Sequence, residues 1–420
     1  MKPSGIEWIG DIPDDWEVRK LLSLFKEHKD RNKNLEEQNL LSLSYGKIKR
    51  KDINNNDGLL PASFETYNIV ENGDIVFRLT DLQNDKRSLR TGIVTQRGII
   101  TSAYVTIRPK IRLDSRFFHY LYHMYDICKV FYGMGDGVRQ GMGFEDLKNI
   151  PTLIPPLKTQ QKIADYLDKK CGEIDATIAK QKESIEKLKA YKQSLISETV
   201  TKGLDKSAPL KPSGIKWIGD IPDDWEVRRL KGLGEQTIGL TYSPQDITDN
   251  LGTLVLRSSN IQNGRLVLDR DDNVYVSIDV ENKILKDEDI LICSRNGSRN
   301  LVGKTAFVIT YGKKLSYGAF TTIFRSKYNR FLFYVFNAGV FEYHLASYNT
   351  STINQLTTSM LNEIRVPLPP LKTQRKIADY LDSKCSQIDK YITEKQNIIQ
   401  KLDAYKKSLI FECVTGKHKI

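Results

Sequence analysis

The sequence lacks the features that mark membrane and secreted proteins. None of its 420 residues belongs to an unbroken apolar run of the roughly twenty residues that a membrane-spanning helix needs. The opening "MKPSGIEWIGDIPDDW" is not the basic and then apolar layout of a secretory signal. Its five cysteines, at positions 128, 171, 293, 385 and 413, show no C-x-x-C spacing, which is typical of free thiols in a reducing compartment. We therefore expect a cytoplasmic globular protein.

Catalytic and metal-binding motifs are also missing. The stretch "GSRNLVGKT" at 297–305 has one residue too many between its glycines for a phosphate-binding loop, and β-rich residues follow where that loop needs a helix. His119 and His123 have a spacing that suits zinc, but Phe333 and Asn337 replace them in a second copy described below, so we expect a structural pair. No nucleophile elbow, calcium loop, methyltransferase tetrapeptide or nuclease pattern occurs. The sequence predicts no catalytic residue, no metal ligand and no enzymatic activity.

Positive charge, in contrast, is abundant. The formal net charge is +12 and the isoelectric point is near 9.2. An excess of this size indicates a polyanionic partner, most simply a nucleic acid. On composition alone, a merely basic globular protein is an equal alternative.

The most informative feature is a duplication. The segment "KPSGIEWIGDIPDDWEVRK" starts at Lys2, and "KPSGIKWIGDIPDDWEVRR" starts at Lys211. A second pair, "PPLKTQQKIADYLD" and "PPLKTQRKIADYLD", starts at Pro155 and Pro369 and extends through similar residues for more than forty positions. We call the first pair segments A and A′. Identical segments suit two copies of one partner or contact with each other, whereas the dissimilar interiors between them suit two different targets.

The residues after each Pro-Pro pair predict a long helix with a narrow apolar seam of coiled-coil type. Polar residues interrupt the seam at equivalent places, Gln181 and Lys395, then Lys192 and Lys406. The predicted seam residues are Leu167, Cys171, Ile174, Ile178, Ile185, Leu188 and Leu195 in the first copy, and Leu381, Cys385, Ile388, Ile392, Ile399, Leu402 and Leu409 in the second.

These patterns predict an α+β fold with two globular domains separated by two long antiparallel coiled-coil helices and related by a pseudo-twofold axis. We expect the boundaries 1–156 for the first domain, 157–203 for the first helix, 204–370 for the linker and second domain, and 371–413 for the second helix. The two chain termini are expected to lie close together, because the connection after the first helix resembles the two ends of the chain brought together.

Cations mixed with Asn and Gln cluster in the interiors, and such residues grip phosphates and pair with base edges. The candidates for DNA contact in the first domain are Lys47, Lys49, Arg50, Arg78, Lys86, Arg87, Arg90, Arg139 and Gln140. Those in the second domain are Arg257, Asn260, Gln262, Arg295, Asn296, Arg299, Asn300, Lys304, Asn349, Thr350, Asn354 and Gln355. Taken singly, each is more often a solvated surface residue.

The chain resembles the DNA-specificity subunit of type I restriction–modification systems. The resemblance rests on "WIGDIPDDWEV" opening each half, on "IPPLKTQQKIADYLD" and "PLPPLKTQRKIADYLD" closing each domain, and on the long helices that follow. It implies two target-recognition domains that each read one half of a split double-stranded DNA sequence. It also implies that the helices set the gap and bind two methyltransferase subunits, which restriction subunits then join.

The resemblance further implies that S-adenosylmethionine, ATP and magnesium belong to those partners, with no cofactor in this chain. A stand-alone nucleic-acid-binding regulator that dimerises through a coiled-coil rod is the alternative function. The tryptophans Trp8, Trp16, Trp217 and Trp225 all lie in segments A and A′, and core packing and partner contact are equally good interpretations of them.

Overall fold

The computed structural model describes residues 1–53, 61, 63–80, 82, 89–133, 141–341, 343–344 and 355–420. The chain forms two compact units, Met1–Gln181 with Gln396–Ile420 (unit 1) and Lys182–Lys395 (unit 2). The two longest helices, α4 (Leu157–Lys202) and α8 (Leu371–Val414), each contribute residues to both units. Among the described residues, no helix is apolar over a length sufficient to span a membrane.

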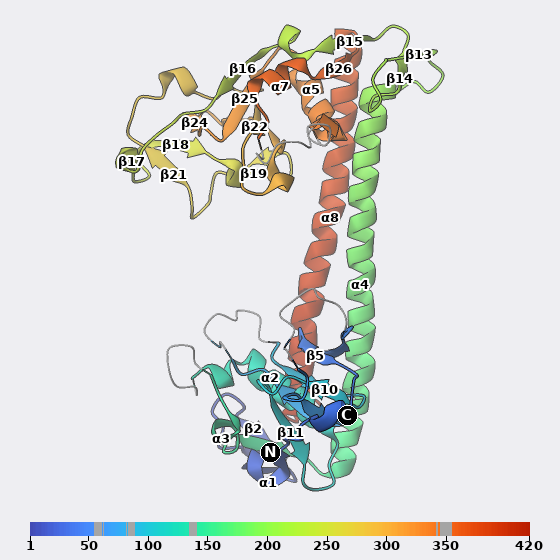
Figure 1. The fold of residues 1–420 in the computed structure, drawn as a ribbon, viewed down its shortest axis with the longest axis vertical. Helices are drawn as coiled ribbons and strands as arrows, with labels where there is room; N and C mark the ends of the chain where they lie inside the picture. Colours follow the sequence, from blue (N-terminus) through green and yellow to red (C-terminus); the bar gives the residue numbers. More distant parts are fainter. Residues whose placement is uncertain are drawn as a thin grey trace. The chain divides into compact units, whose positions relative to one another are not determined.

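Unit 1 is built on a four-stranded antiparallel sheet that packs with helix α2, Ser115–Ile127 (Figure 1). Phe117, Phe118 and Leu121 of α2 are fully buried in the core of this unit. In spatial order the strands are β4 (Phe25–Glu27), β11 (Val105–Pro109), β8 (Ile75–Phe77) and β9 (Thr91–Ile93). Two strand pairs extend the unit, β5 (Leu41–Ser44) with β6 (Lys47–Arg50) and β7 (Asn68–Val70) with β10 (Gly98–Ile100).

Unit 2 repeats this arrangement with an equivalent sheet and helix α5, Asn329–Val335. Its four strands follow in spatial order as β16 (Glu235–Ile238), β25 (Thr321–Arg325), β22 (Ile290–Cys293) and β23 (Thr305–Phe307). A second sheet contains β17 (Ile247–Thr248), β21 (Val274–Val276), β18 (Thr253–Leu256) and β24 (Leu315–Tyr317). The matching strand order shows that both interiors share one α+β skeleton, as predicted from the repeat.

Segments A and A′ close each unit by pairing with the strand that precedes the long helix. The hairpins are β1 (Lys2–Pro3) with β2 (Asp11–Ile12) and β13 (Leu210–Pro212) with β14 (Asp220–Pro222). The longer pairings are β3 (Glu17–Lys20) with β12 (Pro151–Ile154) and β15 (Glu226–Arg229) with β26 (Arg365–Leu368). Trp16 and Trp225 are each 2% exposed and pack edge-on against Phe117 and Phe331, so these two tryptophans are core residues.

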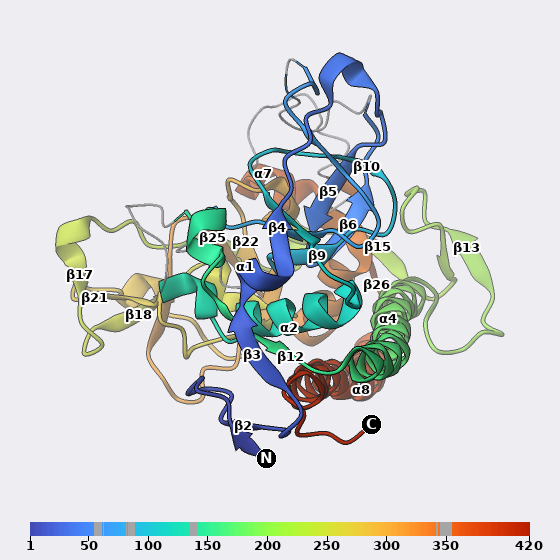
Figure 2. The same cartoon turned by 90° about the horizontal axis from the view of Figure 1, so that it is seen from below.

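Figure 2 shows α2 and α4 of unit 1, and an ionic clamp joins the two helices. Arg116 donates from Nη1 to Asp165 at 2.8 Å and to Asp168 at 2.9 Å, and the Tyr120 hydroxyl donates to Asp168 at 2.9 Å. The clamp recurs in unit 2 with Arg330, Asp379, Asp382 and Tyr334. Because the same set holds the helix onto the domain in both units, the attachment of domain to helix belongs to the shared skeleton.

In each unit the local parts of α4 and α8 run antiparallel, and a cross-helix ion pair occupies a polar interruption of the seam. Lys406 Nζ donates to Asp175 at 2.6 Å in unit 1, and Lys192 Nζ donates to Asp389 at 2.7 Å in unit 2. The buried seam residues are Leu167, Cys171, Ile174, Ile178, Ile185, Leu381, Cys385, Ile388 and Leu409, and the half-buried ones are Leu188, Leu195, Ile392, Ile399 and Leu402. The interrupting lysines thus replace apolar packing with paired charges.

Candidate nucleic-acid interface

In unit 2, three chain segments meet at the end of the sheet where β22 ends and its antiparallel neighbour β25 begins. The amides of Ser294 and Arg295 both donate to the carbonyl oxygen of Phe320 at 3.0 Å. The amide of Leu356 donates to the carbonyl oxygen of Ser294 at 2.7 Å and brings in the third segment. Residues more than sixty positions apart in the sequence are therefore fixed side by side.

Arg295 presents an exposed guanidinium at this end of the sheet. Its Nη2 donates to Gln355 Oε1 at 2.6 Å, and the two backbones form an antiparallel bridge. Its Cζ lies 5.8 Å from the centre of the Phe320 ring, within the range of a cation–π contact. Phe320 is itself 60% exposed, although large apolar side chains usually face the core. The Asn296 amide donates to Ser258 Oγ at 3.0 Å and links this end of the sheet to a neighbouring loop.

That neighbouring loop corrects one prediction, the DNA contact of Asn260. Asn260 is 1% exposed, and its Nδ2 donates to the Val267 carbonyl at 3.0 Å and to Asn273 Oδ1 at 2.9 Å. Its side chain is thus committed to holding the loop together and has no exposed surface to offer DNA. Arg257 remains partly exposed but lies 3.3 Å from Asp272 in an ion pair.

The other candidates in unit 2 fall into two groups. Arg299 and Asn300 are exposed, while Lys304 and Gln262 are half-buried. Gln262 lies in β19 (Ile261–Gln262), which pairs with β20 (Arg265–Leu266). Asn349, Thr350 and Asn354 lie outside the described residues.

In unit 1, Lys47, Lys49 and Arg50 are exposed along β6, and Arg78 is exposed just after β8. Lys47 Nζ lies 3.5 Å from Asp175 on α4, so its charge is already partly balanced. Lys86, Arg87, Arg139 and Gln140 lie outside the described residues.

Arg90 is the second corrected prediction. It is 3% exposed, and its Nη1 donates to the carbonyl oxygens of Arg78 at 3.1 Å and Thr80 at 2.6 Å. Its backbone amide donates to Asp126 Oδ2 at 2.7 Å. Arg90 therefore stabilises the chain that follows β8 from inside the unit and offers no surface to a ligand.

His119 and His123 lie on α2 with their rings stacked 6.2 Å apart. Burial lowers the pKa of His119 to about 4. Burial also lowers the pKa of His123, to about 3, helped by the positive charges of Lys406 and Lys407. Among the described residues, no cluster of His, Cys, Asp and Glu is arranged to hold a metal ion. The stacked rings are half-buried packing elements of unit 1.

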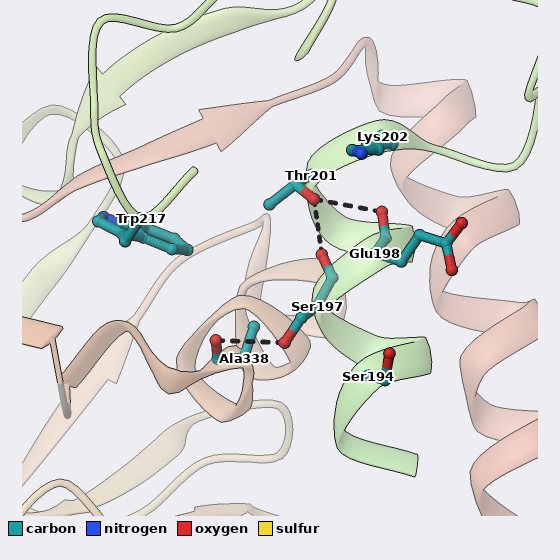
Figure 3. A pocket seen from close by; sticks show the side chains of 7 residues that line it. All are labelled: Ser194, Ser197, Glu198, Thr201, Lys202, Trp217 and Ala338. Carbon is teal, nitrogen blue, oxygen red and sulfur yellow. Dashed lines mark hydrogen bonds between the residues drawn. The ribbon is translucent and has the colours of Figure 1, made fainter. Parts of the chain in front are cut away.

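A partly open cavity of about 210 Å³ lies beside α4 in unit 2 (Figure 3). It is lined by Ser194, Ser197, Glu198, Thr201, Lys202, Trp217 and Ala338. At the places equivalent to Ser197 and Ala338, unit 1 has Phe411 and Met124. Phe411 packs 6.4 Å from the Trp8 ring in unit 1. The cavity therefore arises from two smaller side chains on a shared framework.

Two copies of one α+β skeleton, with common flanks and chemically different exposed loops, define a protein of two tandem recognition domains. The sequence profile of the "type I restriction modification DNA specificity domain" matches residues 13–189 and 222–404. The chain therefore belongs to the family of type I restriction–modification DNA specificity subunits and carries the family's domain twice.

Similar proteins agree with this assignment. The type I restriction enzyme MjaVIII specificity subunit of Methanocaldococcus jannaschii is 25% identical over 426 residues, which cover 97% of this chain and 94% of that protein. The EcoKI specificity subunit of Escherichia coli K12 is 26% identical over 208 residues, 47% of this chain and 44% of that protein.

Two solved structures share the fold. One, from work on "complex assembly" and "conformational transition of the type I R-M system", has a TM-score of 0.71 at 15% identity, covering 97% of this chain and all of the other. The HsdS subunit of Thermoanaerobacter tengcongensis has a TM-score of 0.51 at 16% identity, covering 97% and 98%.

Proposed function

We propose that each unit reads one half of a bipartite double-stranded DNA target. The observation that carries this proposal is the contrast between an identical sheet order in both units and unlike side chains around the sheets. Unit 2 presents Arg295, Gln355 and Phe320 at the end of its sheet, whereas unit 1 presents the lysine-rich strand β6. A shared scaffold with different exposed groups suits two different half-sites, and the net charge of +12 suits a polyanion.

We also propose that the chain is a non-catalytic subunit that acts in the cytoplasm. Its shared segments would bind two methyltransferase subunits, and restriction subunits would join the assembly. S-adenosylmethionine, ATP and magnesium would then be bound by those partners. Support comes from the relatives, which are named specificity subunits, and from the repetition of segments A and A′ and of the long helices.

The test is to produce the chain together with its methyltransferase subunits in a host without adenine methylation, and to sequence the methylated sites. We expect the methylated sites to contain two short specific DNA sequences separated by a gap of constant length. We also expect a purified complex with two methyltransferase copies per chain. A single uninterrupted recognition sequence would contradict the proposal. Failure to recover the complex would favour the stand-alone regulator.

We propose in addition that the long helices set the gap between the half-sites. Four residues inserted into α4 lengthen a helix by about 6 Å, close to two base pairs of DNA at about 3.4 Å each. We expect the gap in the methylated sites to widen by one or two base pairs. The same four residues inserted beside Gly312, in an exposed turn of unit 2, serve as the control and should leave the gap unchanged. An unaltered gap after the α4 insertion would remove the helices from this role.

A further inference from the structure

We propose that Arg295, held by Gln355 and Phe320, reads a guanine in the half-site recognised by unit 2. This inference rests on the proposed function, because it assigns a base to one residue of the DNA-reading surface. Composition makes Arg295 a candidate, but the sequence does not indicate what holds it or which base it would read. Phe320 is not among the sequence candidates, and "GAFTTIF" has the pattern of a buried strand.

Arg295 carries an exposed positive charge. Two arginines of unit 2 are neutralised: Arg325 lies 2.6 Å from Asp289, and Arg330 pairs with Asp379 and Asp382. Within the part of the chain that the structure describes, Arg295 has no carboxylate in ion-pair range and is exposed. An exposed cation without a counter-charge is suited to an anionic or acceptor-rich ligand.

The Arg295 side chain is preorganised by its neighbours. The Arg295 backbone is fixed by hydrogen bonding to Phe320 and by the bridge with Gln355, and the guanidinium is fixed by the 2.6 Å bond to Gln355 Oε1 and the 5.8 Å contact with the Phe320 ring. A long, flexible side chain held in this way loses less conformational freedom on binding. A nonspecific phosphate contact needs no such support, since a mobile lysine or arginine suffices.

The hydrogen-bonding pattern of the Arg295 guanidinium suits guanine. A guanidinium has five N–H donors in one plane, and Gln355 takes one of them. The remaining donors can form the parallel pair that matches O6 and N7 of guanine in the major groove. Gln355 is disfavoured as an adenine reader because its Oε1 already accepts from Arg295, and that oxygen would otherwise accept from the adenine amino group.

Among the described residues, the cluster occurs in the second copy of the skeleton and not in the first. When β8 is aligned with β22, Thr80 occupies the position equivalent to Arg295. When β11 is aligned with β25, Tyr104 occupies the position equivalent to Phe320. Thr80 cannot supply a bidentate cationic fork. The guanine should therefore belong to the half-site of unit 2, which leaves the half-site of unit 1 as an internal reference in any experiment.

The experiment compares methylated-site sequences for the complex carrying wild-type chain, Arg295→Ala, Arg295→Lys, Gln355→Ala or Lys313→Ala. Lys313 is an exposed cation in the turn after β23, at the opposite end of the same sheet, and controls for loss of one positive charge. Binding of the purified complexes to duplexes with each base at each half-site position, at two salt concentrations, gives the discrimination factors. Thermal unfolding of each variant checks that it folds.

We expect Arg295→Ala to lose about 5- to 150-fold of discrimination for guanine at one position of one half-site, the range of a bidentate base contact. Arg295→Lys should recover only part of it, Gln355→Ala should lose less than Arg295→Ala, and Lys313→Ala should change nothing. Uniform weakening across all sequences with a reduced salt slope would make Arg295 a phosphate contact and overturn the inference. If Arg295→Ala lost discrimination for a base other than guanine, or lost no discrimination, the inference would also be overturned. A wild-type complex without a bipartite motif would instead refute the proposed function.

Discussion

We expect the half-buried histidines of α2 to add to the acid sensitivity of unit 1, as His344, whose pKa burial also lowers, adds to that of unit 2. Folded-state pKa values of about 4 for His119 and about 3 for His123 lie below the ordinary value of 6.5, so the unfolded chain binds more protons between these values. The contribution of the two neutral rings to the free energy of unfolding is therefore fully present above pH 6.5. This contribution is lost progressively as the pH falls toward the folded-state pKa values. Each fully titrating group contributes a slope of about 1.4 kcal/mol per pH unit.

The second copy supplies the matched variant, His119→Phe with His123→Asn, after Phe333 and Asn337. We expect this variant to keep near-wild-type melting at pH 7.5 and to lose less stability than wild type between pH 6.5 and pH 5. The measurement is the melting temperature of both proteins across that range. Carboxylates titrate in both proteins, so only the difference between the curves is informative. Parallel curves would show that the histidines do not set the acid sensitivity.

At the scale of single residues, composition could not separate surface cations from structural ones. Arg90 belongs to the same basic run as Lys86 and Arg87, yet its side chain turns inward to two carbonyl oxygens. Asn260 likewise stabilises a loop through a partner thirteen residues away. Such contacts depend on how distant segments fold back, and no local pattern encodes them.

At the scale of elements, the two cross-helix ion pairs are the strongest test of the seam. Lys192 and Asp389 side chains are 24% and 35% exposed, so their pair is less screened than one on the open surface. A polar pair within an apolar seam contributes little net stability but favours one register, because any shift leaves a charge against apolar side chains.

We expect Lys192→Asp to destabilise the protein, and adding Asp389→Lys to restore much of the loss, with a coupling of about 1 kcal/mol. The equivalent exchange of Lys406 and Asp175 in unit 1 should restore less, because Lys47 lies 3.5 Å from Asp175 and would face the new lysine. Chemical denaturation of all variants gives the coupling energies. Reversal of the exposed pair Lys189 and Glu186, 55% and 71% exposed, is the control and should give almost none. Equal coupling energy at the control pair would mean that the position within the seam does not strengthen the ion pair.

The long helices were predictable because a seam sustained over many turns is a strong local signal. The strands were harder to place, because most span two to four residues and pair with distant segments, such as β3 with β12. The gathering of Arg295, Phe320 and Gln355 was not predictable for the same reason. Each residue lies in a separate loop. The antiparallel neighbours β22 and β25 bring Arg295 beside Phe320, and an isolated bridge brings Gln355 beside Arg295.

At the scale of the molecule, both ends of the chain belong to unit 1. Gly416 follows α8 with a positive φ of 72° and packs beside Trp16, just as Gly203 follows α4 with a φ of 74° and packs beside Trp225. The path after α8 toward segment A therefore resembles the covalent connection between α4 and segment A′.

We accordingly expect a circular permutant, joined from Ile420 to Met1 by a short Gly-Ser linker and opened between Gly203 and Lys211, to fold and to keep its DNA gap. The melting temperature and the sequences of methylated sites provide the measurement. A matched permutant opened between Ile185 and Leu188, inside α4, should fail to fold, because it interrupts a helix that contributes to both cores. An unfolded first permutant would contradict the equivalence of the two connections.

Unit 1 is assembled from two separate segments of the chain, and this has a consequence for its folding during synthesis. Its core includes Leu409, Ile410, Cys413 and Val414, which a ribosome adds more than two hundred positions after α4 has been synthesised. Unit 2 is one continuous stretch of the chain and can fold during translation. Unit 1 cannot complete its core until the end of α8 has been synthesised, so part of its apolar surface stays exposed to solvent until then. The domain synthesised first is therefore completed last, and a message cut short after residue 395 yields one finished domain beside one that lacks part of its core.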